Sequence, residues 1–342
     1  MSDRVPAVWF PTIRAGTGAD VFTERLAAEL RGRGFQADIT WLPLRAEYAP
    51  STVRVPKVPG WATVCHVNTW LHPRFIPRQL PVVATLHHSI HDPALEPYKG
   101  WLRAAYHRWW IAPVERRVLC RADRVVAVSQ FVADMARQTL CDVPMQVICN
   151  GIDAGLFRPG CRARQKSEPF RLLYVGSWMA RKGVDLLAPI MRQLGDGFEL
   201  HYTGGEEAAR DRPEMPPNMH DIGRLSGSSV AAAMQAADAF LFPSRSEGLP
   251  LVVIEAMACG LPVIGVRETA VSEVVEHGVT GFLCPRDDVP AFVAAVQALS
   301  GNTQRRIDMA HAAHKAVIAR FSFTSMVDAY VRLYQSLGVE SA

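Results

Sequence analysis

Two glutamates flank an apolar run in the second half of the chain, in the segment SEGLPLVVIEAMACGLPVIG (residues 246–265). An ionised carboxylate is costly to bury without a partner, so Glu247 and Glu255 each need a cation or hydrogen-bond donors. Two sources meet that need. Glu255 could pair with an internal arginine while Glu247 is solvated, or both could bind a ligand that carries hydroxyl groups.

A helix predicted over about residues 250–259 begins just after the first glutamate. Pro250 favours a helix start, and Gly260 suits the helix end. The first-turn N–H groups, around Leu251 and Val252, would lie at the positive end of the helix dipole, where phosphate binds. Because carboxylates repel a phosphate unless they accept hydrogen bonds from neutral hydroxyls, a nucleoside diphosphate sugar fits this site.

Basic residues stand at a similar position in YVGSWMARKGVDLL (residues 174–187). Arg181 and Lys182 follow a strand and a glycine-containing loop, where α/β nucleotide-binding folds hold a pyrophosphate. Cations at a helix N-terminus oppose its dipole unless an anion is bound, which favours a phosphate ligand over a solvated helix start. Further along, the IGRL turn with Leu225 is placed to contact a base.

Strand and helix patterns alternate through both halves, which predicts an α/β fold with mostly parallel sheets. The length of 342 residues suits two domains. We expect Rossmann-like domains over 1–160 and 161–322, facing each other across a cleft that binds ligands at the carboxyl ends of the strands. A last helix over 323–342 should pack back toward the first domain through apolar residues at helical spacing: Met326, Tyr330, Leu333 and Leu337.

Composition excludes several functional classes. The hydrophobic share of 49% and charged share of 20% are those of a soluble globular protein, and a net charge of +4 is too small for a nucleic-acid-binding face. Seven scattered cysteines without a C-x-x-C pair argue against disulfides and predict a cytoplasmic protein. No apolar run is long enough to span a bilayer. His201, His311 and His314 show no ligand spacing, and no Asp-x-Asp stands where a metal–diphosphate clamp would be expected, so no metal site is predicted.

These motifs resemble the retaining glycosyltransferase family 4 of the GT-B fold. In the second half the likeness rests on ARKGVDLL, on AADAFLFPSRSEGLPLVVIEAMACGLPVIG with its two glutamates, and on EVVEHGVTGFLCP. In the first half it rests on GTGADVFTERLAAELRGRGF, on ADRVVAVSQFVAD and on VICNGID. The resemblance extends over about residues 8–335. It implies an enzyme that moves a sugar from a nucleoside diphosphate sugar to a saccharide hydroxyl, with no metal or other cofactor.

The resemblance also assigns roles to residues. Glu255 would accept hydrogen bonds from the nucleotide ribose, and Lys182 would hold the diphosphate. The implied catalytic residues are His87, which would face the reacting sugar, Glu247 beside the donor sugar, Arg181 and Lys182. The other donor-binding positions lie in loops and at the helix start: Gly16, Gly18, Ser177, Leu225, Gly248, Leu249, Pro250, Leu251 and Val252.

Three positions depart from the family pattern. Ser177 stands where many members carry arginine, a charge that Arg181 could supply instead. Thr17 replaces a usual glycine, and Thr269–Ala270 replaces a common Gly-Gly, which bears on the identity of the donor sugar. Because of these departures, an alternative interpretation is a non-catalytic subunit that binds a sugar nucleotide without transferring the sugar.

The acceptor is less defined. The segment YKGWLRAAYHRWWIAPVERRV (residues 98–118) is rich in tryptophan, tyrosine and arginine, which suits a membrane interface. That interpretation predicts a lipid-linked saccharide acceptor and peripheral contact with the inner face of the cytoplasmic membrane. Alternatively, Trp101, Ala105 and Trp109 pack on the sheet, as any crossover helix requires.

An NAD(P)-dependent oxidoreductase is the main alternative activity. Gly16 and Gly18 follow a strand, and Asp38 comes twenty residues later, which matches part of a dinucleotide-binding fingerprint. However, Val21 stands at the third glycine position. Asp38 would also enter its strand, whereas a ribose-binding acid sits at the carboxyl end of one.

Overall fold

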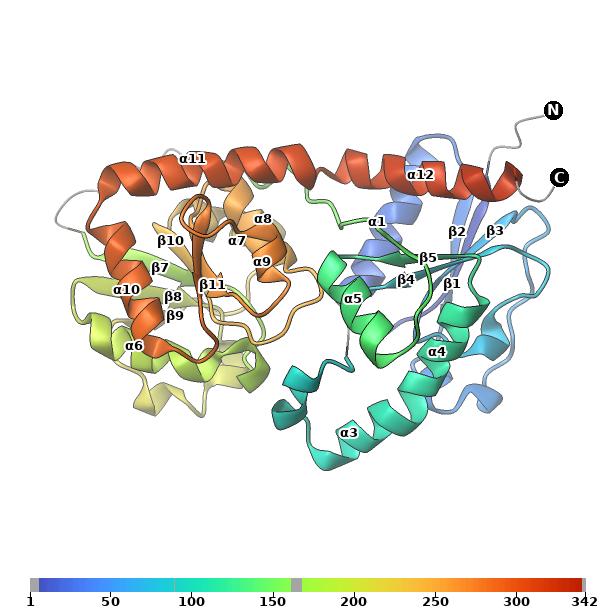
Figure 1. The fold of residues 1–342 in the computed structure, drawn as a ribbon, viewed down its shortest axis with the longest axis horizontal. Coiled ribbons are helices and arrows are strands. Elements are labelled where there is room, and N and C mark those ends of the chain that lie inside the picture. The colour runs from blue at the N-terminus through green and yellow to red at the C-terminus, as the bar shows by residue number, and fades with distance from the viewer. Residues whose placement is uncertain (1–5, 89, 161–167, 340–342) are drawn as a thin grey trace. The chain divides into compact units, whose positions relative to one another are not determined.

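The computed structural model describes residues 6–88, 90–160 and 168–339. The chain forms two compact units, one of Met1–Asn150 with Thr324–Ala342 and one of Gly151–Phe323 (Figure 1). Each unit is built on a parallel sheet with helices on its faces, which confirms the predicted α/β class. Within the described ranges, no helix is long and apolar enough to cross a membrane.

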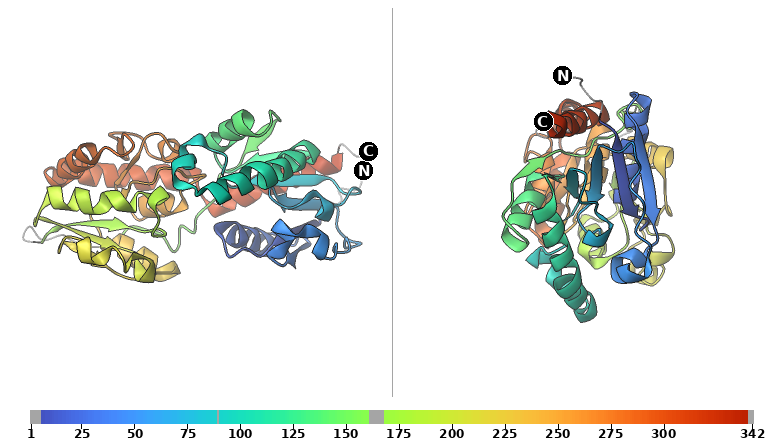
Figure 2. Two further views of the ribbon diagram at one scale, coloured as in Figure 1. Left: turned by 90° about the horizontal axis from the view of Figure 1, so that it is seen from below. Right: turned by 90° about the vertical axis from the view of Figure 1, so that its right-hand side faces the viewer.

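The sheet of the first unit has six strands among the described residues, in the order β2-β1-β3-β4-β5-β6. Helix α1 lies on one side of this sheet and α4 and α5 on the other (Figure 2). The strands are β1 (Val8–Ile13), β2 (Ala37–Leu42), β3 (Val64–Asn68), β4 (Val82–Leu86), β5 (Arg124–Ala127) and β6 (Met145–Val147). The helices are α1 (Gly18–Gly32), α2 (Arg45–Tyr48), α3 (Trp101–Tyr106), a π-helical turn (His107–Ile111), α4 (Ala112–Arg121), α5 (Gln130–Thr139) and α12 (Phe323–Val339).

Helix α12 belongs to the first unit, as the sequence predicted. All four apolar residues named for this contact are buried. A buried polar network adds to the packing: His66 Nδ1 lies 2.6 Å from Tyr334 Oη, and His66 Nε2 lies 2.7 Å from Thr85 Oγ1. Thr85 Oγ1 in turn lies 3.2 Å from Tyr330 Oη. Because every member of the network has a partner, burial of these polar groups is compatible with a stable core.

The second unit also has six strands among the described residues, in the order β12-β11-β10-β7-β8-β9. The strands are β7 (Phe170–Tyr174), β8 (Phe198–Tyr202), β9 (Met219–Asp221), β10 (Ala239–Phe242), β11 (Val263–Val266) and β12 (Gly281–Cys284). The α-helices are α6 (Leu187–Leu194), α7 (Gly227–Gln235), α8 (Leu251–Ala258), α9 (Val271–Val274), α10 (Val289–Ser300) and α11 (Thr303–Arg320).

The strand order of the second unit predicts where a ligand would bind to it. The chain runs outward from β7 through β8 to β9, then returns to the other side of β7 and continues through β10, β11 and β12. The direction of winding therefore changes between β7 and β10. In open parallel sheets, ligands bind at such a switch point, beside the carboxyl ends of the strands. The loops that follow β7 and β10 are the ones that carry the basic residues and the first glutamate.

Candidate donor site

Lys182 and Glu247 meet at the switch point of the second unit. Lys182 ends a short 3₁₀ turn (Ala180–Lys182) after β7, and Glu247 lies in the loop after β10. Lys182 Nζ is 2.6 Å from Glu247 Oε1, and Ser244 Oγ lies 2.5 Å from the same oxygen. Glu247 is buried, so the expectation of a merely solvated carboxylate is wrong. The pair and the serine hydroxyl meet the need for partners that burial imposes.

Gly183 allows these two loops to approach each other. Its φ of +72° lies in the left-handed region, which favours glycine. A Cβ at this position would stand 2.1 Å from the carbonyl oxygen of Pro243, which follows β10. The contact leaves no room for a side chain, so the backbone at Gly183 sets the position of the neighbouring Lys182.

Arg245 links the loop after β10 to the turn that carries Lys182. This residue was not identified from the sequence. Its buried guanidinium makes two bonds of 2.7 Å to the carboxylate of Asp185 and one of 2.6 Å to Asp287 Oδ1. It also donates to the carbonyl of Ala180, at the start of the turn that carries Lys182. The Asp185 carboxylate raises the pKa of Arg245 above its ordinary value. Nothing in local sequence marks Arg245, because its partners lie 60 and 42 residues away.

Arg181 and Ser177 lie in the same loop after β7. Arg181 Nη1 is 3.5 Å from the carbonyl oxygen of Ser246, next to Glu247. The Ser177 side chain is exposed, and its carbonyl accepts a bond of 3.1 Å from Tyr174 Oη. Arg181 therefore brings a second positive charge to the loop that precedes α8, while Ser177 brings a neutral one-carbon side chain.

Helix α8 starts at Leu251, after Pro250, with Gly248 buried and Leu249 half-buried in the preceding loop. The Leu251 N–H already donates to the carbonyl of Leu249 at 2.9 Å. The Leu251 N–H, predicted to lie where phosphate binds, is therefore already used within the loop, because the backbone turns tightly before the helix. Val252, also half-buried, is the next residue of the first turn.

Glu255 lies about one turn into α8 and is half-buried, although the run around it looks fully buried in sequence. Leu225 is also half-buried, in the segment between β9 and α7.

Thr269, which replaces a glycine common in the family, is buried. Its Oγ1 accepts from the Val271 N–H (3.2 Å) and donates to the Val266 carbonyl (3.2 Å). The Thr269 hydroxyl thus bonds backbone groups on both sides of the start of α9.

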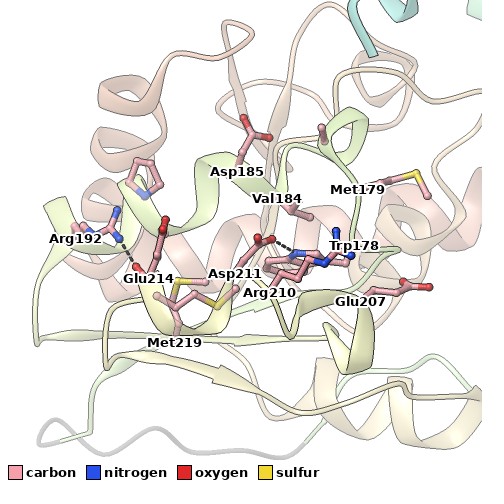
Figure 3. A pocket seen from close by; sticks show the side chains of 14 residues that line it. Trp178, Met179, Val184, Asp185, Arg192, Glu207, Arg210, Asp211, Glu214 and Met219 are labelled. Atoms are coloured by element: carbon pink, nitrogen blue, oxygen red, sulfur yellow. Dashed lines mark hydrogen bonds between the residues drawn. The ribbon is translucent and has the colours of Figure 1, made fainter. Parts of the chain in front are cut away.

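A separate cavity of about 500 Å³ lies beside the 3₁₀ turn, and none of the predicted donor-binding residues lines it (Figure 3). Two arginines, Arg192 and Arg210, face it together with a larger number of carboxylates: Asp185, Glu207, Asp211 and Glu214. Asp211 accepts a bond of 2.7 Å from Trp178 Nε1. An excess of carboxylates repels a diphosphate, so we do not assign the donor to this cavity.

In the first unit, the loop after β1 is held by Asp20. The Asp20 Oδ2 atom accepts the N–H groups of Ala15 (2.9 Å) and Gly16 (2.7 Å). Gly16 has a φ of +70°, and Gly18 begins α1. The Gly16 N–H is therefore already used within the loop. The role implied for Gly16 and Gly18, close approach of backbone to phosphate, remains a prediction.

His87 follows β4 and is oriented by an amide. Its Nε2 atom lies 3.0 Å from Asn68 Oδ1, and Asn68 Nδ2 donates to Thr12 Oγ1 at 3.0 Å. With the amide in this orientation, His87 Nε2 carries the proton and Nδ1 keeps a lone pair. Phe22 of α1 packs edge-on against the ring at 4.7 Å. Desolvation lowers the pKa of His87 to about 3, so the ring is neutral and Nδ1 is a hydrogen-bond acceptor.

The dinucleotide fingerprint gains no support from the first unit. Asp38 is the second residue of β2, at the amino end of the strand, and its side chain lies 3.7 Å from Arg31. A ribose-binding acid would stand at the opposite end of such a strand.

Comparisons with known proteins agree with this architecture. The family description "Glycosyl transferases group 1" matches residues 169–302, and "Glycosyltransferase Family 4" matches residues 61–156. A glycogen synthase from Mycobacterium tuberculosis is 28% identical over 289 residues, covering 79% of this chain and 68% of that protein. A D-inositol 3-phosphate glycosyltransferase from Catenulispora acidiphila is 26% identical over 318 residues, covering 83% and 75%.

Solved structures show the same fold. Sucrose-phosphate synthase from Thermosynechococcus elongatus aligns with a TM-score of 0.80 at 20% identity, over 97% of this chain and 99% of that one. Anabaena HepE in complex with UDP and glucose aligns with a TM-score of 0.72 at 17% identity, over 96% and 99%. The two parallel units define a two-domain α/β protein of the GT-B class. The chain belongs to the glycosyltransferases that the two matching family descriptions cover, as its motifs predicted.

Proposed function

We propose that this chain transfers a sugar, with retention of anomeric configuration, from a nucleoside diphosphate sugar to a saccharide or lipid-linked saccharide hydroxyl, and that it needs no metal. The Lys182–Glu247 pair at the switch point of the second unit carries the proposal. The pair brings a cation and a carboxylate together in a chain of this family, which supports a site for a diphosphate and sugar hydroxyls. The UDP and glucose bound to the HepE neighbour support a nucleotide-linked donor.

In this proposal, Lys182 and Arg181 stabilise the negative charge that builds up on the departing diphosphate. Preorganised charges of this kind are usually the largest contribution to catalysis. Glu247, already held by Ser244, accepts hydrogen bonds from donor-sugar hydroxyls, and Glu255 accepts from the ribose. Loop backbone at Gly248–Val252 meets the sugar and diphosphate, with Ser177 and Leu225 nearer the pyrophosphate and base. The charges of Lys182 and Arg181 fill the role that a divalent cation has in metal-dependent transferases.

His87 is assigned a positioning role within the first unit. A neutral ring with Nδ1 as acceptor can receive a hydrogen bond from a sugar hydroxyl, but it holds no proton to donate from that atom. Retention then follows from attack on the face that the leaving group vacates, with a diphosphate oxygen taking the acceptor proton. This step uses no enzyme nucleophile.

Contact with the cytoplasmic face of a membrane is part of the proposal, and α3 and the π-helical turn support it. Trp101, Leu102 and Trp109 are 77%, 66% and 74% exposed, so the expectation that the two tryptophans pack on the sheet is wrong. Arg103 and Arg108 lie among them in sequence. Exposed tryptophan and leucine interleaved with arginine suit the interface of an anionic bilayer. The six cysteines within the described ranges form no disulfide with one another.

Thermal shift tests the donor site first. Purified protein is heated with UDP, GDP, ADP and NADH, and the panel is repeated with Glu255→Ala. Stabilisation by one nucleoside diphosphate that Glu255→Ala abolishes supports the donor site and identifies the base. Stabilisation by NADH alone, unchanged in the variant, overturns the proposal in favour of the oxidoreductase.

Turnover separates an enzyme from a non-catalytic subunit. Slow hydrolysis of the matching nucleotide sugar without acceptor, measured by NMR, is expected to release the α- or β-sugar with the configuration of the donor. Release of the opposite anomer contradicts retention, and tight binding without turnover under any acceptor favours a binding subunit. Activity unchanged after EDTA treatment is the expected result for metal independence.

Co-sedimentation with vesicles tests the membrane contact. Vesicles containing phosphatidylglycerol should retain the protein more than vesicles of phosphatidylcholine alone. Trp101→Ala combined with Trp109→Ala should abolish the difference, whereas Leu44→Ala, which removes another exposed apolar side chain of the first unit, should not. Equal binding of the double tryptophan variant and of Leu44→Ala to the phosphatidylglycerol vesicles contradicts the proposal that Trp101 and Trp109 contact the membrane.

A further inference from the structure

Two histidines and a glutamate converge on the outer strands of the second unit. Glu199 and His201 are two residues apart on β8, so their side chains leave the same face of the sheet. His201 is directly paired with His220 of β9. The His201 Nε2 atom lies 3.6 Å from Glu199 Oε1, and the His220 Nε2 atom lies 4.0 Å from Glu199 Oε2.

These separations are close to those of a metal site. One ligand atom from each of the three residues lies within 4.8 Å of the other two. Around a tetrahedral zinc ion with bonds of about 2.0–2.1 Å, ligand atoms stand about 3.4 Å apart. Small side-chain rotations therefore bring the three atoms to coordination distance, while the strand pairing keeps their backbones in place.

The ligand set selects a class of metal. Two imidazoles and one carboxylate suit zinc and its neighbours cobalt, nickel and copper. Magnesium and calcium prefer oxygen ligands and are excluded by this set. His220 is exposed and His201 is half-buried, so a cation can enter from solvent.

Arg171 of β7 orients the carboxylate. Its Nε atom donates to Glu199 Oε1 at 2.5 Å, and its Nη1 atom donates to the carbonyl of Ala236 at 3.3 Å. The arginine engages Oε1 and leaves Oε2 to face His220. An outer partner that fixes a ligating carboxylate in this way commonly strengthens metal binding.

We propose that Glu199, His201 and His220 bind a divalent cation of the zinc class, which links β8 to the edge strand β9. The cluster lies along the strands, while Lys182 and Glu247 lie in loops beyond the carboxyl ends of β7 and β10. The cation is therefore a stabilising ligand of the second unit and takes no part in the charge stabilisation assigned to Lys182. The sequence around His201 did not predict this cluster, because His220 comes next to His201 only through the pairing of β8 with β9.

Calorimetric titration of the chelator-treated full chain with Zn²⁺ tests the proposal. We expect one ion per chain, a rise in melting temperature with Zn²⁺, and no rise with Mg²⁺. His220→Ala should weaken binding by more than about 10-fold and remove the rise in melting temperature. His311→Ala, which removes an exposed histidine of α11, should behave like the unmodified chain.

His220 is exposed, so His220→Ala should melt like the unmodified chain in the absence of metal. This comparison separates loss of a ligand from loss of the fold. Absence of Zn²⁺ binding in the unmodified chain overturns the proposal, as does equal affinity in His220→Ala. An equal effect of Mg²⁺ overturns the assigned class of metal.

Discussion

Lys182 and Glu247 are 65 residues apart in sequence, and their charged atoms lie 2.6 Å apart in the structure. Both side chains are mostly buried. Removing one partner of such a pair leaves an uncompensated buried charge, so the two loops that carry them depend on each other. The pair also means that the cation assigned to the diphosphate is already oriented by a carboxylate before a donor binds.

Lys182→Ala and Glu247→Gln should affect different steps. Lys182→Ala removes the charge that we propose faces the diphosphate, so we expect weaker nucleotide binding and a transfer rate lower by about 10²–10³-fold. Glu247→Gln keeps the cation, so nucleotide affinity should change less than sugar transfer. Titration with the nucleotide and steady-state kinetics separate the two effects. Arg210→Ala, which removes an exposed arginine of the same unit, is the control, and an equal loss in that variant contradicts the assignment.

Arg245→Met should destabilise the second unit. The substitution keeps much of the side-chain length but leaves Asp185 and Asp287 without their shared cation. Because both carboxylates are about half exposed and stay hydrated, the loss should be about 1.5–3 kcal/mol, as for hydrogen bonds to charged groups. Asp185→Asn should cost less, because Arg245 keeps its bond to Asp287 and the new amide oxygen can still accept from the guanidinium. Urea unfolding measures both, and a smaller loss for Arg245→Met than for Asp185→Asn would show that the guanidinium does not anchor the loop.

Gly183→Ala should impair both stability and donor binding. The new Cβ would collide with the Pro243 carbonyl and force the turn that carries Lys182 to move. Gly34→Ala is the control for strain alone, since Gly34 has a φ of +83° after the end of α1 but no atom within 4 Å of an added Cβ. The control should lose only about 1–2 kcal/mol from backbone strain and keep its nucleotide affinity. Equal affinity in the two variants would mean that the close contact does not position Lys182.

Stability should fall as pH drops below the ordinary pKa of histidine. Burial lowers the pKa of His66 to about 3, and the nearby His87 adds to the shift. The unfolded chain takes up the proton near pH 6.5 while the folded chain resists it. The contribution of neutral His66 is therefore complete above pH 6.5 and is lost progressively toward pH 3, by about 1.4 kcal/mol per pH unit.

His66→Gln tests this dependence, because glutamine can still bond Tyr334 and Thr85 but does not titrate. Unfolding free energies measured between pH 7 and 5 should fall less steeply in the variant. The same slope in both proteins would show that His66 does not contribute to the acid sensitivity.

Much of the fold could be predicted from local pattern. Alternating apolar strands and helices indicated a parallel α/β architecture, because a strand covered on both faces has a distinct composition. The apolar spacing from Met326 to Leu337 indicated a face that α12 buries on the first unit. The sequence also indicated the loops with Lys182 and Glu247 as a predicted phosphate site, since basic residues and glycine after a strand are typical of such sites.

Contacts between distant segments were decided only by the tertiary structure. Strand order places β7 beside β10, and this placement pairs Lys182 with Glu247 and Arg245 with Asp185. Register places His220 opposite His201. No local spacing encodes such pairings, because they follow from how whole strands and helices pack. The sequence by itself thus determined which residues could do the chemistry, and the packing of the strands decided which of them meet.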